Sequence, residues 1–223
     1  MEVFLKNFIE SIKNCPLFFD ISDQDILHML KCLDAKIIKY DKKQTVISEG
    51  DAAKTICVVL SGSVQMFQID YYGNRSIISN AEKYSVFAEE FSCAGNMTVP
   101  VSVVASEPSV IMHIESKRVL HTCSNYCSFH QRLIFNLMKD LAEKNVLSHQ
   151  KIEIISKRTT RDKLMTYLML QSKNSRKKCF EIPFNRQELA DYLEVDRSGL
   201  SVEISKLKRE GIIDCDKKTF KIR

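Results

Sequence analysis

The chain has 223 residues, of which 44% are hydrophobic and 27% charged, with only 6 Gly and 4 Pro. This composition excludes disordered, collagen-like and low-complexity chains, and the length allows one large domain or two ordinary ones. The longest apolar runs, such as residues 56–60, are far shorter than the roughly 20 residues of a membrane span. No secretory signal is visible in the first residues, so we expect a cytoplasmic protein without membrane contact.

Charge is distributed unevenly along the sequence. The net charge is +5, but residues 156–223 hold 17 Lys and Arg against 10 Asp and Glu, whereas residues 1–155 hold 16 against 18. This asymmetry predicts that the C-terminal third meets a polyanion. The eight cysteines are expected to be free thiols or ligands, because a cytosolic compartment keeps thiols reduced.

Two short helices are predicted at the N-terminus. The first carries apolar residues at helical spacing and ends before Pro16; these residues are Phe4, Leu5, Phe8, Ile9 and Ile12. In the second, Ser22 and Asp25 are spaced as in a capping box, and Ile26, Leu27 and Leu30 form its buried stripe.

From about Ala35 the pattern changes to short β-branched and aromatic runs separated by turn residues. The predicted strands are residues 36–39, 45–48, 55–60, 63–70, 75–79, 101–105 and 110–114. Repeated short strands with tight turns favour an antiparallel barrel or sandwich.

One long helix is predicted from about Ser124 to Ile155. Its apolar and inserted polar residues advance by alternating steps of four and three, which is typical of a two-stranded coiled coil. The proposed seam is Ile134, Met138, Leu141, Asn145, Ser148, Ile152 and Ile155. The pattern therefore favours a homodimer; the alternative is a helix that lies along the core of its own domain.

The C-terminal residues form a helix-turn-helix pattern with a wing. Residues 160–171 are predicted to be helical and residues 174–178 to form a basic loop. Leu189, Ala190 and Leu193 mark the buried face of a further helix, residues 194–196 form a turn, and Asp196 can cap the next helix. In that last helix Leu200, Ile204 and Leu207 form the core stripe, and residues 211–222 read as a β-hairpin.

Two short helices joined by a tight turn, with a basic and hydroxyl-rich face on the second, suit the major groove of double-stranded DNA. Arg197 is placed to reach guanine O6 and N7, while serines can reach base edges or phosphates. The candidate DNA-binding residues are Arg186, Gln187, Arg197, Ser198, Ser201, Val202, Ser205 and Lys206. A solvated helix hairpin without a partner is the alternative.

With these features, the sequence resembles the Crp/Fnr superfamily of bacterial transcription regulators over nearly its whole length. The resemblance rests on residues 16–18, 48–51 and 60–64, which look like a cyclic-nucleotide-binding β-roll, and on residues 186–190 and 196–201, which are similar to the family's helix-turn-helix. Two departures are Ser198, where cyclic-AMP-responsive members usually carry Glu, and Glu194, where a turn glycine is common. The first implies a different operator.

The resemblance implies an α+β chain with a jelly-roll-like sensor domain over residues 1–123, a long dimerisation helix over 124–156 and a winged helix-turn-helix over 157–223. It also implies RNA polymerase as a partner. Members that bind cyclic AMP use Gly-Glu and Arg-Ser pairs, where this chain has Ala88-Glu89 and Val99-Pro100. A buried phosphodiester would lack its charge partner, so cyclic AMP is not expected as the effector.

The effector remains unidentified, and the sequence names no cofactor. Lys144 and Asn145 fall where the resemblance places adenine-contacting residues, so a pocket with altered chemistry is expected. A pocket lined by Phe91, Val99 and Pro100 would suit a small, partly apolar ligand. The candidate pocket residues are Ala88, Glu89, Phe91, Val99, Pro100, Lys144 and Asn145.

A set of cysteines and histidines around the start of the long helix is the last candidate site. Cys123, Cys127 and His130, with Cys93 earlier in the chain, are spaced so that they could bind zinc or form a redox pair. Buried cysteines also act simply as small hydrophobic residues, so no metal is assigned. The iron–sulfur cluster of Fnr-like members is not supported, since only Cys15 and Cys32 lie near the N-terminus.

A DNA-binding regulator is thus the leading hypothesis. A ligand-binding regulatory module that acts through protein contacts would leave the winged helix unexplained, and a thiol or metal redox sensor would rest on the cysteine set alone. An enzyme is not expected, because residues 36–79 contain no histidine, and the sequence shows neither a Gly-rich phosphate loop nor a nucleophile elbow.

Overall fold

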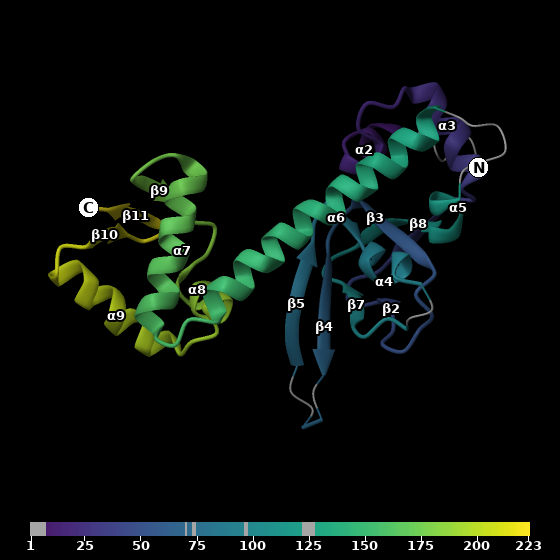
Figure 1. Cartoon of the computed structure of the whole chain (residues 1–223). Helices are drawn as coiled ribbons and strands as arrows, with labels where there is room; N and C mark the ends of the chain where they lie inside the picture. Colours follow the sequence, from purple (N-terminus) through teal and green to yellow (C-terminus); the bar gives the residue numbers. More distant parts are fainter. Residues whose placement is uncertain (1–7, 70, 73–74, 96–97, 122–127) are drawn as a thin grey trace. The chain divides into compact units, whose positions relative to one another are not determined.

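The computed structural model describes residues 8–69, 71–72, 75–95, 98–121 and 128–223. The chain divides into two compact units, residues 1–143 and 144–223, and Figure 1 labels most of their helices and strands. The first contains two antiparallel sheets and the second a three-stranded sheet with helices. The predicted α+β fold class is confirmed.

The N-terminal helices are α2 (Ile9–Lys13), the 3-10 turn η1 (Pro16–Phe18) and α3 (Asp23–Cys32). As predicted, the first helix ends before Pro16; Phe4 and Leu5 lie outside the described residues. Ser22 Oγ accepts a hydrogen bond from the Asp25 amide at 3.2 Å. The Asp25 carboxylate accepts from Ser22 Oγ at 2.6 Å, which caps the helix through one backbone amide.

The β-roll consists of two four-stranded antiparallel sheets, with strand orders β1-β8-β3-β6 and β2-β7-β4-β5. The strands of the first sheet are β1 (Lys36–Tyr40), β8 (Ser109–Glu115), β3 (Thr55–Ser61) and β6 (Val86–Phe87). Those of the second are β2 (Thr45–Ile47), β7 (Ser102–Ala105), β4 (Val64–Ile69) and β5 (Arg75–Ala81). All seven predicted strands are present; β6, only two residues long, was not predicted.

Strand β3 connects the two hydrophobic clusters of the roll. Because successive side chains of a strand point to opposite faces, Ile56, Val58 and Leu60 pack with the N-terminal helices. Cys57 and Val59 pack instead between the two sheets. Residues 56–60 are consequently all fully buried, which explains why this strand appears in the sequence as a continuous apolar run.

The turn from β3 to β4, which joins the two sheets, requires glycine at position 62. Gly62 has a φ of +78°, and a Cβ there would lie 2.3 Å from Ser109 Oγ and 2.6 Å from the Pro108 carbonyl oxygen. The next residue is tied to the same place, because the Ser63 amide donates to Ser109 Oγ at 3.1 Å. The backbone of this turn therefore lies directly against the start of β8.

Two short helices, α4 (Glu89–Cys93) and α5 (Ser116–Leu120), precede the long helix α6 (Ser128–Ile155). One residue of the predicted α6 seam, Leu141, is placed differently in the structure. Leu141 packs against the hydrophobic cluster of the N-terminal helices, so it does not belong to an outward seam. The large apolar residues that α6 exposes are Phe135, Met138, Val146, Leu147 and Ile152.

The C-terminal unit contains a winged helix-turn-helix. Its helices are α7 (Thr160–Ser175), α8 (Arg186–Leu193) and α9 (Arg197–Arg209), and its sheet has the order β10-β11-β9. The strands are β9 (Cys179–Glu181), β10 (Ile213–Asp216) and β11 (Thr219–Ile222). Strand β9 was not predicted, and the expected loop at residue 174 was wrong, since α7 continues to Ser175 and ends at Arg176 with a φ of 55°. Among the described residues, no helix is long and apolar enough to cross a membrane.

Candidate nucleic-acid interface and effector pocket

Local hydrogen bonds set the start of both helices of the helix-turn-helix. Asn185 and Glu188 form a reciprocal capping box at α8, with the Glu188 amide 3.0 Å from Asn185 Oδ1 and the Asn185 amide 2.6 Å from Glu188 Oε2. Asp196 caps α9, accepting from the Gly199 amide at 2.8 Å. Between them Glu194 takes a left-handed conformation, with a φ of 53°. This is the turn position at which the family resemblance places glycine.

The core of the unit determines which side of α9 faces outward. Leu200, Ile204 and Leu207 are buried together with Leu189 and Leu193 of α8. Because residues three and four apart share one face of a helix, the opposite face carries the remaining side chains. Six predicted DNA-binding residues lie on α9, and of these Arg197, Ser198, Val202, Ser205 and Lys206 are exposed while Ser201 is half-buried.

The other two predicted DNA-binding residues open α8. The Arg186 guanidinium lies 5.8 Å from the centre of the Phe220 ring, a cation–π distance that orients it beside the wing. Gln187 Nε2 donates to Asp191 Oδ1 at 2.8 Å. A cavity of about 470 Å³ adjoins Arg186 and includes Lys217 and Lys218 of the β10–β11 turn, with Glu181 and Asp216 also in its wall. Its three cations suit an anionic partner such as a DNA phosphate.

The two cations among the predicted DNA-binding residues of α9, Arg197 and Lys206, differ in their surroundings. No ion pair or hydrogen bond engages the Arg197 guanidinium within the part of the chain that the structure describes. Lys206 Nζ, by contrast, lies 3.5 Å from Glu203 Oε2. Arg197 therefore keeps its full hydrogen-bonding capacity for an external acceptor, whereas Lys206 would have to share its charge with Glu203.

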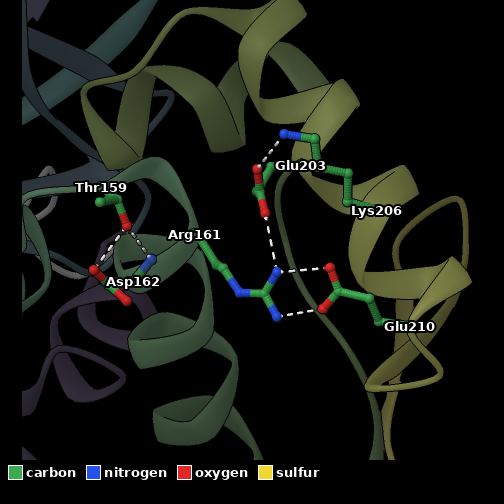
Figure 2. Close-up of polar contacts among 6 residues, drawn as sticks. All are labelled: Thr159, Arg161, Asp162, Glu203, Lys206 and Glu210. Carbon is green, nitrogen blue, oxygen red and sulfur yellow. Dashed lines mark hydrogen bonds and ion pairs between the residues drawn. The ribbon is translucent and has the colours of Figure 1, made fainter.

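A network of charged residues that was not predicted from the sequence holds α9 against α7. Figure 2 shows Arg161 between Glu203 and Glu210. Its guanidinium binds both Glu210 oxygens, with Nη1 2.9 Å from Oε1, and reaches Glu203 Oε1 at 3.5 Å. The hydrogen bond between Arg161 and Glu210 raises the pKa of the arginine and lowers the pKa of the glutamate. The ion pair therefore keeps both the Arg161 guanidinium and the Glu210 carboxylate in their charged forms.

In the roll, the predicted effector residues are largely occupied with packing. Ala88, Glu89 and Val99 are buried, and Phe91 is a partly buried member of the cluster between the sheets. Pro100 is exposed. Ala88 precedes α4 with a φ of 62°, a conformation that costs a residue with a Cβ roughly 1–2 kcal/mol. Lys144 and Asn145 belong to the second unit.

A small cavity is present on the Val99 side of the roll. It measures about 140 Å³, and its walls include Asp51, Lys54, Thr55, Val99 and His113. Sites for drug-sized ligands usually enclose about 300–1,000 Å³. The cavity is therefore too small for a cyclic nucleotide without rearrangement of the side chains around it.

Behind this cavity lies a chain of polar contacts that sequence analysis missed. Tyr40 Oη lies 3.0 Å from His113 Nε2, and Cys57 Sγ lies 3.3 Å from His113 Nδ1. Burial raises the pKa of Cys57 to about 12 and lowers that of His113 to about 4. Both groups are therefore neutral near pH 7, and the imidazole donates to one neighbour and accepts from the other.

The predicted cysteine and histidine set is described only in part, because Cys123 and Cys127 lie outside the described residues. His130 is 5% exposed, and its Nε2 donates to the Val119 carbonyl at 2.8 Å. Cys93 is partly buried against the N-terminal cluster, and burial raises the pKa of its thiol. No group of three or more His, Cys, Asp or Glu residues in the described ranges could hold a metal ion.

Comparison with known proteins assigns both units. Residues 37–126 match the cyclic nucleotide-binding domain, and residues 162–223 match the Crp-like helix-turn-helix domain. The transcriptional activator protein FnrL of Cereibacter sphaeroides is 23% identical over 184 residues, which cover 78% of this chain and 71% of FnrL.

Solved structures share the fold. CprK in complex with OCPA is 17% identical with a TM-score of 0.65, and the match covers 86% of this chain and 90% of CprK. The c-di-GMP-responsive global regulator CLP of Xanthomonas campestris is 17% identical with a TM-score of 0.58, covering 87% and 98% of the two chains. FixK2 of Bradyrhizobium japonicum has a TM-score of 0.52 at 16% identity, covering 85% and 92%.

Proposed function

The chain belongs to the Crp/Fnr family of DNA-binding transcription regulators, and on that premise we propose that it acts as a homodimer under the control of a small effector other than cyclic AMP. Each protomer would insert α9 into the major groove of one operator half-site. The observation that carries the proposal is the outward face of α9, on which Arg197 has an unengaged guanidinium. RNA polymerase is the further partner that family membership suggests.

Pairing through α6 is supported by the residues that the helix exposes. Phe135, Met138 and Ile152 are 58%, 65% and 59% exposed. Together with three smaller or polar exposed residues they advance by alternating steps of three and four, which is the spacing of a coiled-coil seam. The proposed seam is Phe135, Met138, Ala142, Asn145, His149 and Ile152. It keeps three of the seven residues predicted from the sequence, replaces three others with the next residue along the chain, and leaves out Ile155.

An effector other than cyclic AMP is supported by the roll itself. Val99 and Pro100 offer no cation to a phosphodiester, and Ala88, Phe91 and Val99 are part of the packed cluster. The cavity beside Val99, at about 140 Å³, suits a smaller and partly apolar molecule. Such a ligand would bind next to Thr55 and His113, which with Asp51 and Lys54 supply polar groups of the wall.

The test of the proposed function is selection of bound sequences from random duplex DNA by the full-length protein, with and without an extract of the native host. The wild-type protein is expected to enrich a two-fold symmetric site with half-sites about one helical turn apart. Arg197→Ala should remove the preference for guanine, at a cost of about 1–3 kcal/mol per half-site. Arg158→Ala, which removes the same charge from an exposed position outside α9, should retain the wild-type preference.

Two results would contradict the proposal. Failure of the wild-type protein to bind duplex DNA at low salt would exclude the regulator function for this chain. An unchanged guanine preference in Arg197→Ala would exclude the role given to that residue. Dimerisation is tested by light scattering after gel filtration, in which Met138→Glu should yield a monomer and Met169→Glu, an exposed position on α7, should leave the dimer intact.

A further inference from the structure

The serines on the outward face of α9 have limited capacity to discriminate between bases. Ser201 Oγ donates to the Arg197 carbonyl at 3.0 Å and Ser205 Oγ to the Ser201 carbonyl at 2.9 Å. Ser198 Oγ donates to the Asp196 carboxylate that caps the helix. With their protons used inside the chain, these hydroxyls act outward as acceptors.

An acceptor alone cannot distinguish the two kinds of base pair in the major groove. Adenine presents its N6 amino group there and cytosine presents its N4 amino group, so both A·T and G·C pairs offer a donor. What remains unique to A·T pairs is the 5-methyl group of thymine, and what marks guanine is its pair of acceptors, O6 and N7. Specific recognition by α9 therefore falls to residues other than the serines.

Val202 is the apolar residue at the centre of this face. It lies opposite the buried stripe of α9, with Ser198 one turn before it and Ser205 one turn after it. Its side chain is 54% exposed, so burial in the core does not account for an apolar side chain here. The β-branched side chain is held in one rotamer by the helix, which fixes its methyl groups before any partner arrives.

We infer that Val202 specifies thymine in each operator half-site through contact of its methyl groups with the thymine 5-methyl group. The inference rests on the proposed function. Arg197 then supplies guanine recognition from the start of the helix, five residues earlier. A separation of five residues is about 7.5 Å along a helix, or on the order of two base-pair steps. The operator half-site should therefore contain a guanine and a thymine at about that spacing.

The experiment uses the operator obtained by selection and replaces each thymine in turn by deoxyuridine, which removes only the 5-methyl group. Wild-type protein is expected to lose about fourfold in affinity per half-site at one thymine position, the effect of one methyl-sized contact. Val202→Ala should bind the thymine and deoxyuridine duplexes equally at that position. Met169→Ala truncates another exposed apolar side chain in the same unit. It should lose as much affinity as wild type when that thymine is replaced by deoxyuridine.

The outcomes separate this inference from the proposed function. Sequence-specific binding that is insensitive to deoxyuridine at every thymine would overturn the inference and leave the regulator function standing. The same deoxyuridine loss in Val202→Ala as in wild type would overturn it as well. Absence of any preferred sequence in the wild-type selection would remove both. Thermal unfolding of the two variants confirms that they are folded, which is expected because both side chains are exposed.

Discussion

The neutral imidazole of His113 makes the stability of the roll depend on pH. Its pKa is lowered from 6.5 to about 4 because burial disfavours the charged form. When the pH falls below 6.5, the unfolded chain takes up a proton at this residue and the folded chain does not. The unfolded state is then favoured, so the contribution of the neutral imidazole is complete above pH 6.5 and is lost progressively as the pH falls toward 4.

The magnitude follows from the two pKa values. Between pH 7 and pH 5, a group with a pKa of 6.5 in the unfolded chain and about 4 in the folded chain lowers the free energy of unfolding by about 2 kcal/mol. Its hydrogen-bonding neighbours do not titrate in this range, because burial raises the pKa values of both Tyr40 and Cys57.

The assay is urea unfolding of the wild-type protein and of His113→Gln at pH 7 and pH 5. The variant is expected to be less stable than wild type at pH 7, because it disturbs the contacts with Tyr40 and Cys57. Between pH 7 and pH 5, however, its free energy of unfolding should fall by about 2 kcal/mol less than that of wild type. His28→Gln, at an exposed histidine of α3, serves as the control and should keep the wild-type pH dependence. Equal pH dependence of wild type and His113→Gln would refute the reasoning.

Three further predictions concern the C-terminal unit. Gly199→Ala should stabilise the protein by about 1 kcal/mol in urea unfolding, since alanine is the better helix former and the new Cβ would meet only Asp196 Oδ2 at 3.7 Å; a loss of stability would contradict this. Glu194→Gly should raise stability by roughly 1 kcal/mol by relieving the left-handed backbone at a φ of 53°, whereas Glu194→Ala should not. Arg161→Gln should lower the thermal midpoint at low salt, because it removes the ion pair with Glu210. That difference should shrink in 1 M NaCl as screening increases, and a salt-independent difference would show that the contact is not electrostatic.

Local patterns in the sequence were sufficient to predict most elements of the fold. Several features follow from neighbouring residues alone, and all of them are present: the strands with alternating β-branched residues, the end of α2 before Pro16, and the cap that Asp196 forms on α9. The strands missed, β6 and β9, have two and three residues and owe their hydrogen bonds to strands far away in the chain. Segments this short contain too few residues to show the alternation of apolar and polar residues by which a strand is predicted.

The candidate site was predictable where it lies on one helix and not where it depends on distant contacts. The outward residues of α9 follow from its buried stripe alone. Tyr40 and Cys57, in contrast, contact His113, which lies 73 and 56 residues away from them in the sequence. Arg161 contacts Glu210, which lies 49 residues away. The placement of Leu141 in the α6 seam failed for a related reason, because only tertiary packing shows that Leu141 faces the core of its own unit.

The turn at Gly62 limits how the roll can diverge among descendants of this chain. Even a methyl group would collide with Ser109 and with the backbone of Pro108, so a change at position 62 has to coincide with a shift of the segment that begins β8. The junction between the two sheets thus couples position 62 to residues that lie more than forty positions later in the chain.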